Sequence, residues 1–231
     1  MRTGLGTITA LLLLVSAASA QPGFQGRPIT ENAFAPTGYT LHKEEFTIGI
    51  GPVHYGITEN VQVGTNLLFW LIQVYNADAK IAFSKSDRGA FAAGLAVYRL
   101  SLDVSGDEES IDFTEIAPYG AFSFRLSENN MAHLGAQYAW FNAEGNWDVE
   151  DAEASASASG TSFFAGLEHT MTQRTKFMAD VGYDATFEGI RVSGGVMFAW
   201  ERFHLKLGVS YFDAGEGFTL PLVGLWWRFK A

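Results

Sequence analysis

Histidine is the residue type in this sequence best suited to chemistry, because it serves as the general base of nucleophilic catalysis. The chain has five histidines, and acyl transfer would need one of them beside a serine and an acid. His133 and His204 lie close to expected tight turns, His54 lies in an irregular stretch, and His169 lies beside a turn in phase with the apolar face of its strand. None has a serine partner that the sequence places at the end of the fold opposite the tight turns. We therefore predict no catalytic residue.

Acidic residues gather in two stretches, 103–112 and 144–153, and an Ala-Ser repeat follows the second at 154–159. Carboxylate oxygens suit a divalent cation, which could bridge to lipopolysaccharide phosphates. However, the D-x-[DN]-x-[DN]-G pattern of a calcium loop does not occur. The favoured interpretation is solvated loops, with no metal or cofactor site.

Composition excludes several further classes of protein. The chain has no cysteine, so disulfides, thiolate metal sites and lipid attachment to a cysteine are impossible. Its 25 acidic and 15 basic residues give a formal charge of −10, which argues against nucleic acid as a partner.

The N-terminus has the pattern of a secretory signal peptide. Met1-Arg2 is basic, residues 8–15 are largely apolar, and Ala18-Ser19-Ala20 fits a cleavage site before Gln21. The apolar run is too short to cross roughly 30 Å of hydrocarbon. We expect a signal peptide over 1–20 with cleavage between Ala20 and Gln21, and a proline-rich periplasmic extension or irregular lead-in over 21–42.

From residue 43 onward, apolar and polar residues alternate with period two, as in strands with two different faces. The alternation is clearest in these segments: 61–69, 77–84, 131–141, 176–183, 190–200 and 203–212. A short helical turn is the one exception, at 67–73. Phase changes at Val97–Tyr98 and at Gly51–Pro52 predict β-bulges.

The expected connections alternate in length. The short ones are 58–60, 85–88, 126–130, 170–174 and 199–202, and the longer ones are 70–76, 103–110, 142–160, 184–188 and 213–217. Such alternation is typical of a membrane barrel with periplasmic turns and external loops. We predict an all-β fold: an antiparallel transmembrane β-barrel over 43–231 with about 12 strands, ten being the alternative.

The polar faces of the strands carry both signs of charge, which indicates a lumen of mixed charge. The lumen-facing polar residues are predicted to be Asp78, Lys80, Glu115, Lys176, Asp180, Arg191, Lys206 and Arg228. Aromatic side chains mark the expected membrane interfaces. These are Trp200 and Trp227, with Trp226, near the periplasmic ends, and Trp70 and Trp140 near the outer ends.

The last strand places Val223, Leu225, Trp227 and Phe229 on one face. It resembles the closing strand of Gram-negative outer-membrane barrels, although Lys230 and Ala231 follow the final aromatic residue. The stretch 55–61 is similar to a tight hairpin of small, poorly characterised barrels of that superfamily. The resemblance covers about 43–229. It implies location in the outer membrane, contact with its lipids and lipopolysaccharide, and folding by the barrel-assembly machinery.

These observations favour a non-enzymatic barrel, either structural or a narrow solute channel, without a cofactor. Two alternatives stay open. One is an outer-membrane enzyme acting on lipid A or phospholipid, and the other is a secreted soluble β-barrel or sandwich that binds a ligand.

Overall fold

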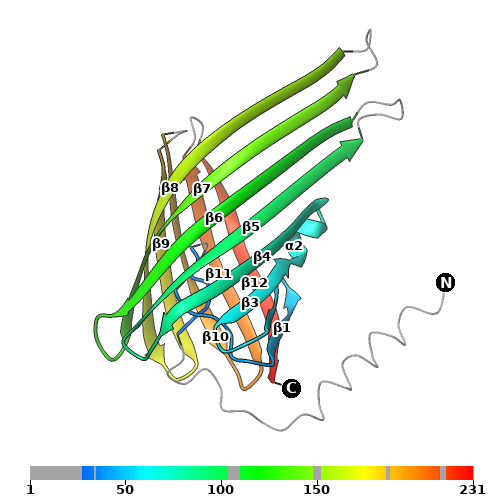
Figure 1. The fold of residues 1–231 in the computed structure, drawn as a ribbon. Coiled ribbons are helices and arrows are strands. Elements are labelled where there is room, and N and C mark those ends of the chain that lie inside the picture. Colours follow the sequence, from blue (N-terminus) through cyan, green and yellow to red (C-terminus); the bar gives the residue numbers. More distant parts are fainter. Residues whose placement is uncertain are drawn as a thin grey trace, which may run out of the picture.

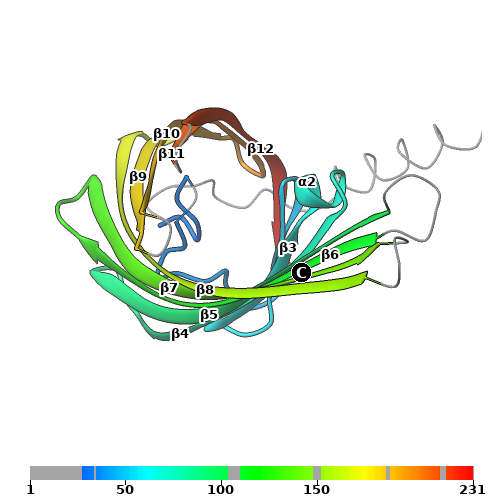
Figure 2. The same cartoon turned by 90° about the horizontal axis from the view of Figure 1, so that it is seen from above.

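The computed structural model describes residues 28–33, 35–103, 110–147, 152–185, 188–213 and 217–230. In it the chain forms a closed barrel of twelve antiparallel strands, in which each strand pairs with its neighbours in sequence and β1 pairs with β12. Figures 1 and 2 show the barrel from the side and from above. The predicted fold class and the count of twelve strands are confirmed.

The strands differ greatly in length. Their bounds are β1 Glu45–Ile50, β2 Pro52–Gly56, β3 Val61–Asn66, β4 Val74–Lys85, β5 Gly89–Asp103, β6 Ser110–Arg125, β7 Asn130–Trp147, β8 Ala152–Thr172, β9 Thr175–Asp184, β10 Gly189–Ala199, β11 Phe203–Asp213 and β12 Phe218–Lys230. The wall is therefore low at β1 to β3 and high at β5 to β8, where the strands rise well above the rest (Figure 1).

The short connections gather at one end of the barrel, where β1 begins and β12 ends (Figure 1). We call it the short-turn end, and the other the long-loop end. The expected connections agree closely with the structure, except that 142–160 is not a long loop. The ladder between β7 and β8 runs from Asn130↔His169 to Trp147↔Ala152, because the Ala-Ser repeat itself alternates with period two.

The expected change of phase at Gly51–Pro52 is a chain reversal rather than a bulge. Strands β1 and β2 pair antiparallel, with Phe46 opposite Tyr55, and Gly51 between them has φ of +115°. A side chain at this φ would be strained, so glycine permits the sharp turn. This reversal supplies the two short strands that raise the strand count from ten to twelve.

The bulge predicted at Val97–Tyr98 was wrong. Strand β5 keeps its register with β6 through both residues, and the irregularity lies on β4 between Ala82 and Ser84. Tyr98 and Phe141 pack against Ala96, Ala117 and Tyr119 inside the barrel. The apparent phase change arose because the lumen of this barrel accepts large apolar groups.

The predicted helical turn is confirmed as α2, Leu67–Trp70. Asn66 caps it, since its side-chain oxygen accepts a hydrogen bond of 3.0 Å from Leu68 N. Leu67 N donates to Gly51 O at 2.8 Å, which sets the helix on the β1–β2 reversal. Among the described residues, no helix is long and apolar enough to cross a membrane.

Side chains alternate between the outside and the inside of the wall. On β11, for example, Leu207 and Val209 are exposed on the outer face, whereas Lys206 and Ser210 are buried inside. The outer face carries many exposed apolar side chains of this kind, as an outer-membrane barrel requires where it meets lipid.

Candidate functional site: the plugged lumen

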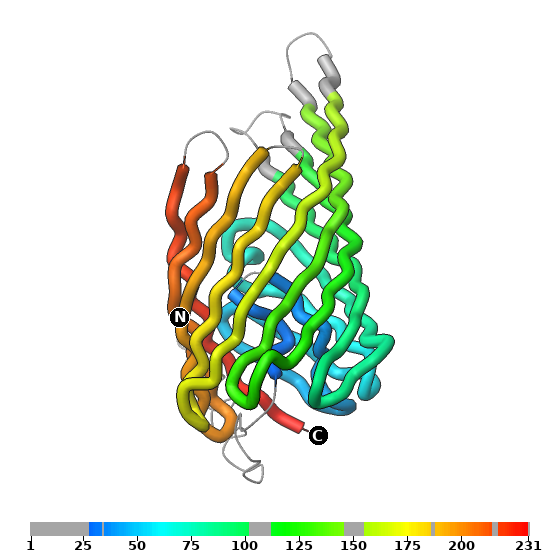
Figure 3. The backbone as a smooth tube through the Cα atoms, turned by 90° about the vertical axis from the view of Figure 1, so that its left-hand side faces the viewer, coloured from blue at the N-terminus to red at the C-terminus, as the bar shows by residue number. Residues whose placement is uncertain are grey.

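A segment of the chain occupies the lumen. The described residues from Pro28 to His42 (28–33 and 35–42) run inside the strands, as the blue chain in Figures 2 and 3 shows. We call these described residues the plug. Its apolar side chains are buried: Ile29, Ala33, Ala35, Tyr39 and Leu41. The sequence suggested a periplasmic extension or an irregular lead-in for this stretch, and its described part lies within the barrel.

The plug turns back on itself at its deepest point. Asn32 N donates to Ala35 O at 2.9 Å, and Glu31 and Pro36 form an antiparallel bridge. Thr37 Oγ1 donates to Ile29 O at 2.7 Å and joins the two arms. The plug thus forms some of its backbone hydrogen bonds within itself, and other backbone groups bond to the barrel wall.

Two lysines of the wall hold carbonyl oxygens of the plug. Lys80 Nζ on β4 donates to Thr30 O at 2.7 Å. Lys206 Nζ on β11 donates to Asn32 O at 3.1 Å and to Ala33 O at 3.2 Å. Both lysine side chains are buried, so these charge-assisted hydrogen bonds form away from bulk water.

Two carboxylates of the wall hold amide groups of the plug in the same way. Ile29 N donates to Glu168 Oε2 at 3.3 Å, and Ala35 N donates to Asp180 Oδ2 at 3.2 Å. The wall therefore offers cations to plug carbonyls and anions to plug amides, and its polarity matches that of the segment it encloses.

The fit is close. Between the plug and the wall of β1, β2, β11 and β12 lies a space of about 40 Å³, beside Ile29, His54 and Trp226. This volume has room for only a few water molecules. A wider cavity of about 320 Å³ lies at the short-turn end, beside Arg125 and Glu168.

A serine, a histidine and a glutamate lie together under the plug. Ser123 Oγ is 2.8 Å from His133 Nδ1, and His133 Nε2 is 3.6 Å from Glu168 Oε2. Ser123 Oγ also accepts a hydrogen bond of 2.8 Å from Gly38 N of the plug, and Lys176 pairs with Glu168. Ser123 and His133 have no exposed surface, so no substrate reaches the hydroxyl while the plug is in place.

Tyr39 fixes the returning arm of the plug to the wall. Its hydroxyl donates to Ser86 O in the turn after β4, at 3.0 Å. Burial raises the pKa of Tyr39 to about 12, so the phenol keeps its proton and remains a donor. This contact holds the arm at the short-turn end of the barrel.

Beyond the plug, the lumen carries a second group of polar side chains. Tyr119 OH donates to Asp78 Oδ2 at 2.8 Å, and Arg191 Nε lies 3.9 Å from Asp180 Oδ1 across the β9–β10 hairpin. Glu115 lies 3.5 Å from the Gln137 amide. Charges of both signs thus line the half of the lumen at the long-loop end as well.

All eight residues predicted to face the lumen are turned inward, but the structure divides them by role. Four contact the plug or lie beside its anchors (Lys80, Lys176, Asp180 and Lys206), three lie towards the long-loop end (Asp78, Glu115 and Arg191), and Arg228 lies at the seam between the first and last strands. Whether they select a solute stays a prediction.

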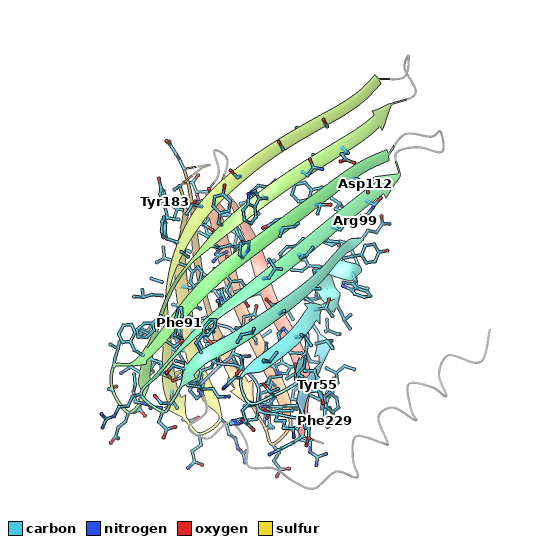
Figure 4. All side chains as sticks on the ribbon, in the orientation of Figure 1. Tyr55, Phe91, Arg99, Asp112, Tyr183 and Phe229 are labelled. Carbon is cyan, nitrogen blue, oxygen red and sulfur yellow. The ribbon has the colours of Figure 1, made fainter. Side chains whose placement is uncertain are left out.

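The four aromatic residues predicted at the membrane interfaces lie on the outer surface. Trp70 stands at α2 against Tyr75, and Trp140 against Tyr138. Trp200 and Trp227 both pack on Phe203 near the short-turn end. Figure 4 shows Phe229 at the same end. Trp226 differs from the prediction, because it points inward and stacks on His204.

Sequence reasoning missed the plug and the part that two polar side chains play in holding it: Ser123 accepts from Gly38 N, and Gln62 Oε1 accepts from Leu41 N at 2.9 Å. One signal was present: Ile29, Ala33, Ala35, Tyr39 and Leu41 are all odd-numbered, as in a segment with one buried face. Prolines and glycines around it obscured this pattern.

Some predictions fall outside the described residues. These are the signal peptide, the cleavage site at Ala20–Gln21, and residues 104–109 and 148–151 of the two acidic stretches. Within the described part of the chain, no group of three or more His, Cys, Asp or Glu residues is placed to hold a metal ion.

No protein-family model and no curated protein sequence matches the chain. Among solved structures, the KdgM porin in complex with disordered oligogalacturonate has a TM-score of 0.51 at 9% identity, covering 80% of this chain and 96% of that one. Ail, the attachment invasion locus protein of Yersinia pestis, in complex with the heparin analogue sucrose octasulfate, has a TM-score of 0.39 at 15% identity, covering 82% and 100%. The chain has the fold of Gram-negative outer-membrane β-barrels.

Proposed function

We propose that this protein is a non-enzymatic outer-membrane barrel that forms a narrow channel, constricted by its own N-terminal segment. The observation that carries the proposal is the plug at residues 28–42, held by Lys80, Lys206, Glu168 and Asp180. Barrels with few strands are largely filled by their own side chains, whereas wide aqueous pores occur at about 16 strands. A twelve-stranded wall with an internal segment leaves little free cross-section.

The charges of the lumen point to small solutes of low net charge. Lys176 pairs with Glu168 and Arg228 with Glu45, while Lys80 and Lys206 are taken up by plug carbonyls. A polyanion such as the oligogalacturonate in the KdgM complex would need basic groups that are not already engaged. The present arrangement therefore favours weak ion selectivity over capture of an acidic polymer.

The burial of the Ser123–His133–Glu168 group supports the absence of catalysis. Gly38 N occupies Ser123 Oγ, and the group lies at the short-turn end, away from the outer leaflet. An enzyme acting on lipid A would need its nucleophile near the outer rim. Mass spectrometry of lipid A before and after deletion of the protein would test this part of the proposal, and an altered lipid would contradict it.

Single-channel recording of the purified protein in planar bilayers tests the channel directly. We expect small or absent conductance for the natural chain and a clear increase for a variant lacking residues 28–42. Heat-modifiable mobility in SDS gels would establish that the shortened barrel still folds. A large, unselective conductance of the natural protein would contradict the proposal.

The expected partners follow from the same location. The outer face would meet membrane lipids, the long-loop end would meet lipopolysaccharide, and the assembly machinery would bind β12 during folding. Cell fractionation that finds the protein free in the periplasm would contradict all three.

A further inference from the structure

The seam between the last and first strands is paired over only part of its length. Strand β1 pairs with β12 from Glu45↔Lys230 to Ile50↔Leu225. Residues 218–224 of β12 pair with β11 on one side, but no described strand pairs with them on the other. At its base, an added side-chain carbon at Gly51 would lie 3.8 Å from Gly224 Cα and 4.0 Å from Leu68 of α2. We call residues 218–224 the open edge.

With the long-loop end facing outward, as the proposed function has it, the open edge lies at the depth of the outer leaflet. Outward Tyr211 pairs with Thr219, and outward Phe203 pairs with Trp227, so these aromatic residues bracket the apolar band on this side. Such a band is roughly 25 Å tall. The six residues of β1 extend roughly 20 Å along a tilted axis, so they cover only its lower part.

The backbone of the open edge is adapted to remain unpaired. Arg228 N donates to Arg202 O, so by the alternation of an antiparallel ladder the even-numbered residues of β12 bond to β11. The odd-numbered residues of the open edge, Thr219, Pro221 and Val223, direct their backbone groups to the free side. Pro221 has no N–H to offer there, and proline on a free edge hinders the addition of another strand.

The side chains of the open edge reverse the usual polarity of a lumen. Its inward residues are Phe218, Leu220 and Leu222, and Phe218 stacks on inward Phe212 with ring centroids 5.1 Å apart. Leu220 is 45% exposed and Phe218 is 50% exposed, although both point into the barrel. Inward positions on the fully paired β10 instead carry Arg191 and Ser193.

The far side of the opening is also apolar. Phe69 of α2 packs edge-on against inward Tyr98, with centroids 6.0 Å apart. Unpaired backbone groups at the depth of the lipid tails are tolerated where they line a cavity that water reaches. Apolar side chains around such an edge favour a ligand that has both a tail and a polar group.

We propose that the open edge admits a long-chain fatty acid from the outer leaflet into the outer half of the lumen. The tail lies along Phe218, Leu220 and Leu222, pointing towards the plug. The carboxylate lies near Arg191, which is adjacent to Phe212 on the neighbouring strand and shares its guanidinium with Asp180 at 3.9 Å. This orientation, with the head towards the long-loop end and the tail towards the membrane centre, is the one that a fatty acid already has in the outer leaflet.

The site ends where the polar wall begins. Gly224 pairs with Lys206, whose ammonium is bound to the plug. A tail that passed Leu222 would meet this buried charge and the plug backbone. The plug therefore closes the site below, and the proposal is one of binding rather than passage to the periplasm.

Quenching by brominated acyl chains tests whether a tail reaches the inner face. The chain has no cysteine, so Leu220→Cys, Ser162→Cys and Val209→Cys each carry a single fluorophore. Leu220 is inward at the open edge, Ser162 is inward on β8 with partners on both sides, and Val209 faces lipid. With the labelled proteins in bilayers of unbrominated lipid, added bromo-stearic acid should quench the labels at positions 220 and 209 but not at 162. Equal protection of positions 220 and 162 would overturn the proposal.

Binding of a dansyl-labelled fatty acid, measured in detergent with folding verified by heat-modifiable mobility, tests the two ends of the ligand. Leu220→Ser should weaken binding, and outward Val223→Ser on the same strand should not. Arg191→Gln should weaken binding of the fatty acid roughly tenfold, the effect of one charge-assisted hydrogen bond, and leave binding of the matching fatty alcohol unchanged. Three outcomes would each overturn the assignment. The first is an equal loss of binding for the fatty acid and the fatty alcohol in Arg191→Gln. The others are quenching at position 220 by brominated phospholipid without any fatty acid, and a dimer whose interface covers position 220.

Discussion

Arg228 on the last strand donates two hydrogen bonds to Glu45 on the first strand, from Nε to Oε1 at 2.5 Å and from Nη2 to Oε2 at 2.8 Å. The two residues are two positions out of register, since Glu45 lies opposite Lys230 and Thr47 opposite Arg228. The pair thus crosses the seam diagonally on the inside of the barrel. His42 N also donates to Glu45 at 2.9 Å, so one carboxylate ties the seam to the end of the plug.

Arg228→Gln should destabilise the barrel markedly. Glu45 would lose its strongest partner in a buried site, and breaking a buried pair in this way costs roughly 3–5 kcal/mol. We expect a lower urea midpoint for loss of the heat-modifiable folded form. Lys43→Gln, at an exposed residue outside the strands, is the control. Equal midpoints for Arg228→Gln and the natural chain would show that the seam does not depend on this pair.

Ser123→Ala should loosen the plug. It removes the acceptor of Gly38 N and leaves a buried amide without a partner, at a cost of roughly 1–3 kcal/mol. We expect brief openings in single-channel records while the barrel stays folded. Ser127→Ala, in the exposed turn after β6, should leave the records unchanged. If neither substitution alters the records, the plug does not depend on the Gly38 contact.

A charge introduced on the outer face should impair assembly of the barrel far more than one introduced on the inner face. Leu207→Arg places a cation at mid-depth among lipid tails, which costs roughly 2–4 kcal/mol. Ser162→Arg places the same cation on the inner face, where water and acidic groups are available. Assembly in cells, measured as the folded fraction in outer membranes, should fall for the first and hold for the second. Equal loss for both would indicate a two-sided core and a soluble protein.

The barrel was predictable because its rule is local. Each outward side chain meets lipid whatever its strand pairs with, so alternation along β10 or β11 reveals the wall without knowledge of the partners. The reversal at Gly51 was harder, since five or six residues on each side are too few to display a period. The phase of Tyr98 was misread because sequence alone does not say that the lumen is apolar at that height.

The plug could not be predicted, because its partners are distant in sequence. Ile29 bonds to Glu168 and Ala33 to Lys206, and nothing in the local pattern of 28–42 specifies contacts more than a hundred residues away. The side chains of Lys80, Asp180 and Lys206 are buried inside the barrel, but which group neutralises each of them depends on how the barrel closes. The open edge likewise requires the register of β12 with both of its neighbours.

The extended β7–β8 hairpin should lie outside the cell. Ser155, Ser157 and Ser159 continue the outward face of β8 beyond Phe163, and serine does not suit lipid contact. Ser157→Cys should therefore react with a membrane-impermeant maleimide on intact cells. Glu128→Cys, in a short turn, should react only after the outer membrane is opened. The reverse result would invert the topology of the barrel.

Replacing Arg191 and Lys206 with serine should open the lumen and change its selectivity. Lys206 holds two plug carbonyls, so its loss releases the tip of the plug at Asn32 and Ala33. Arg191 lies beside Asp180, so its loss exposes that carboxylate to the permeating ion. Together the substitutions remove two positive charges from the path, and the remaining acids favour cations. Reversal potentials in a salt gradient should shift towards the cation value, with a higher conductance. Lys43→Ser removes an exposed lysine outside the barrel wall and should alter neither quantity. A wider pore with unchanged selectivity would mean that ions pass at a distance from Asp180, and an unchanged conductance would mean that the plug is held by its other contacts.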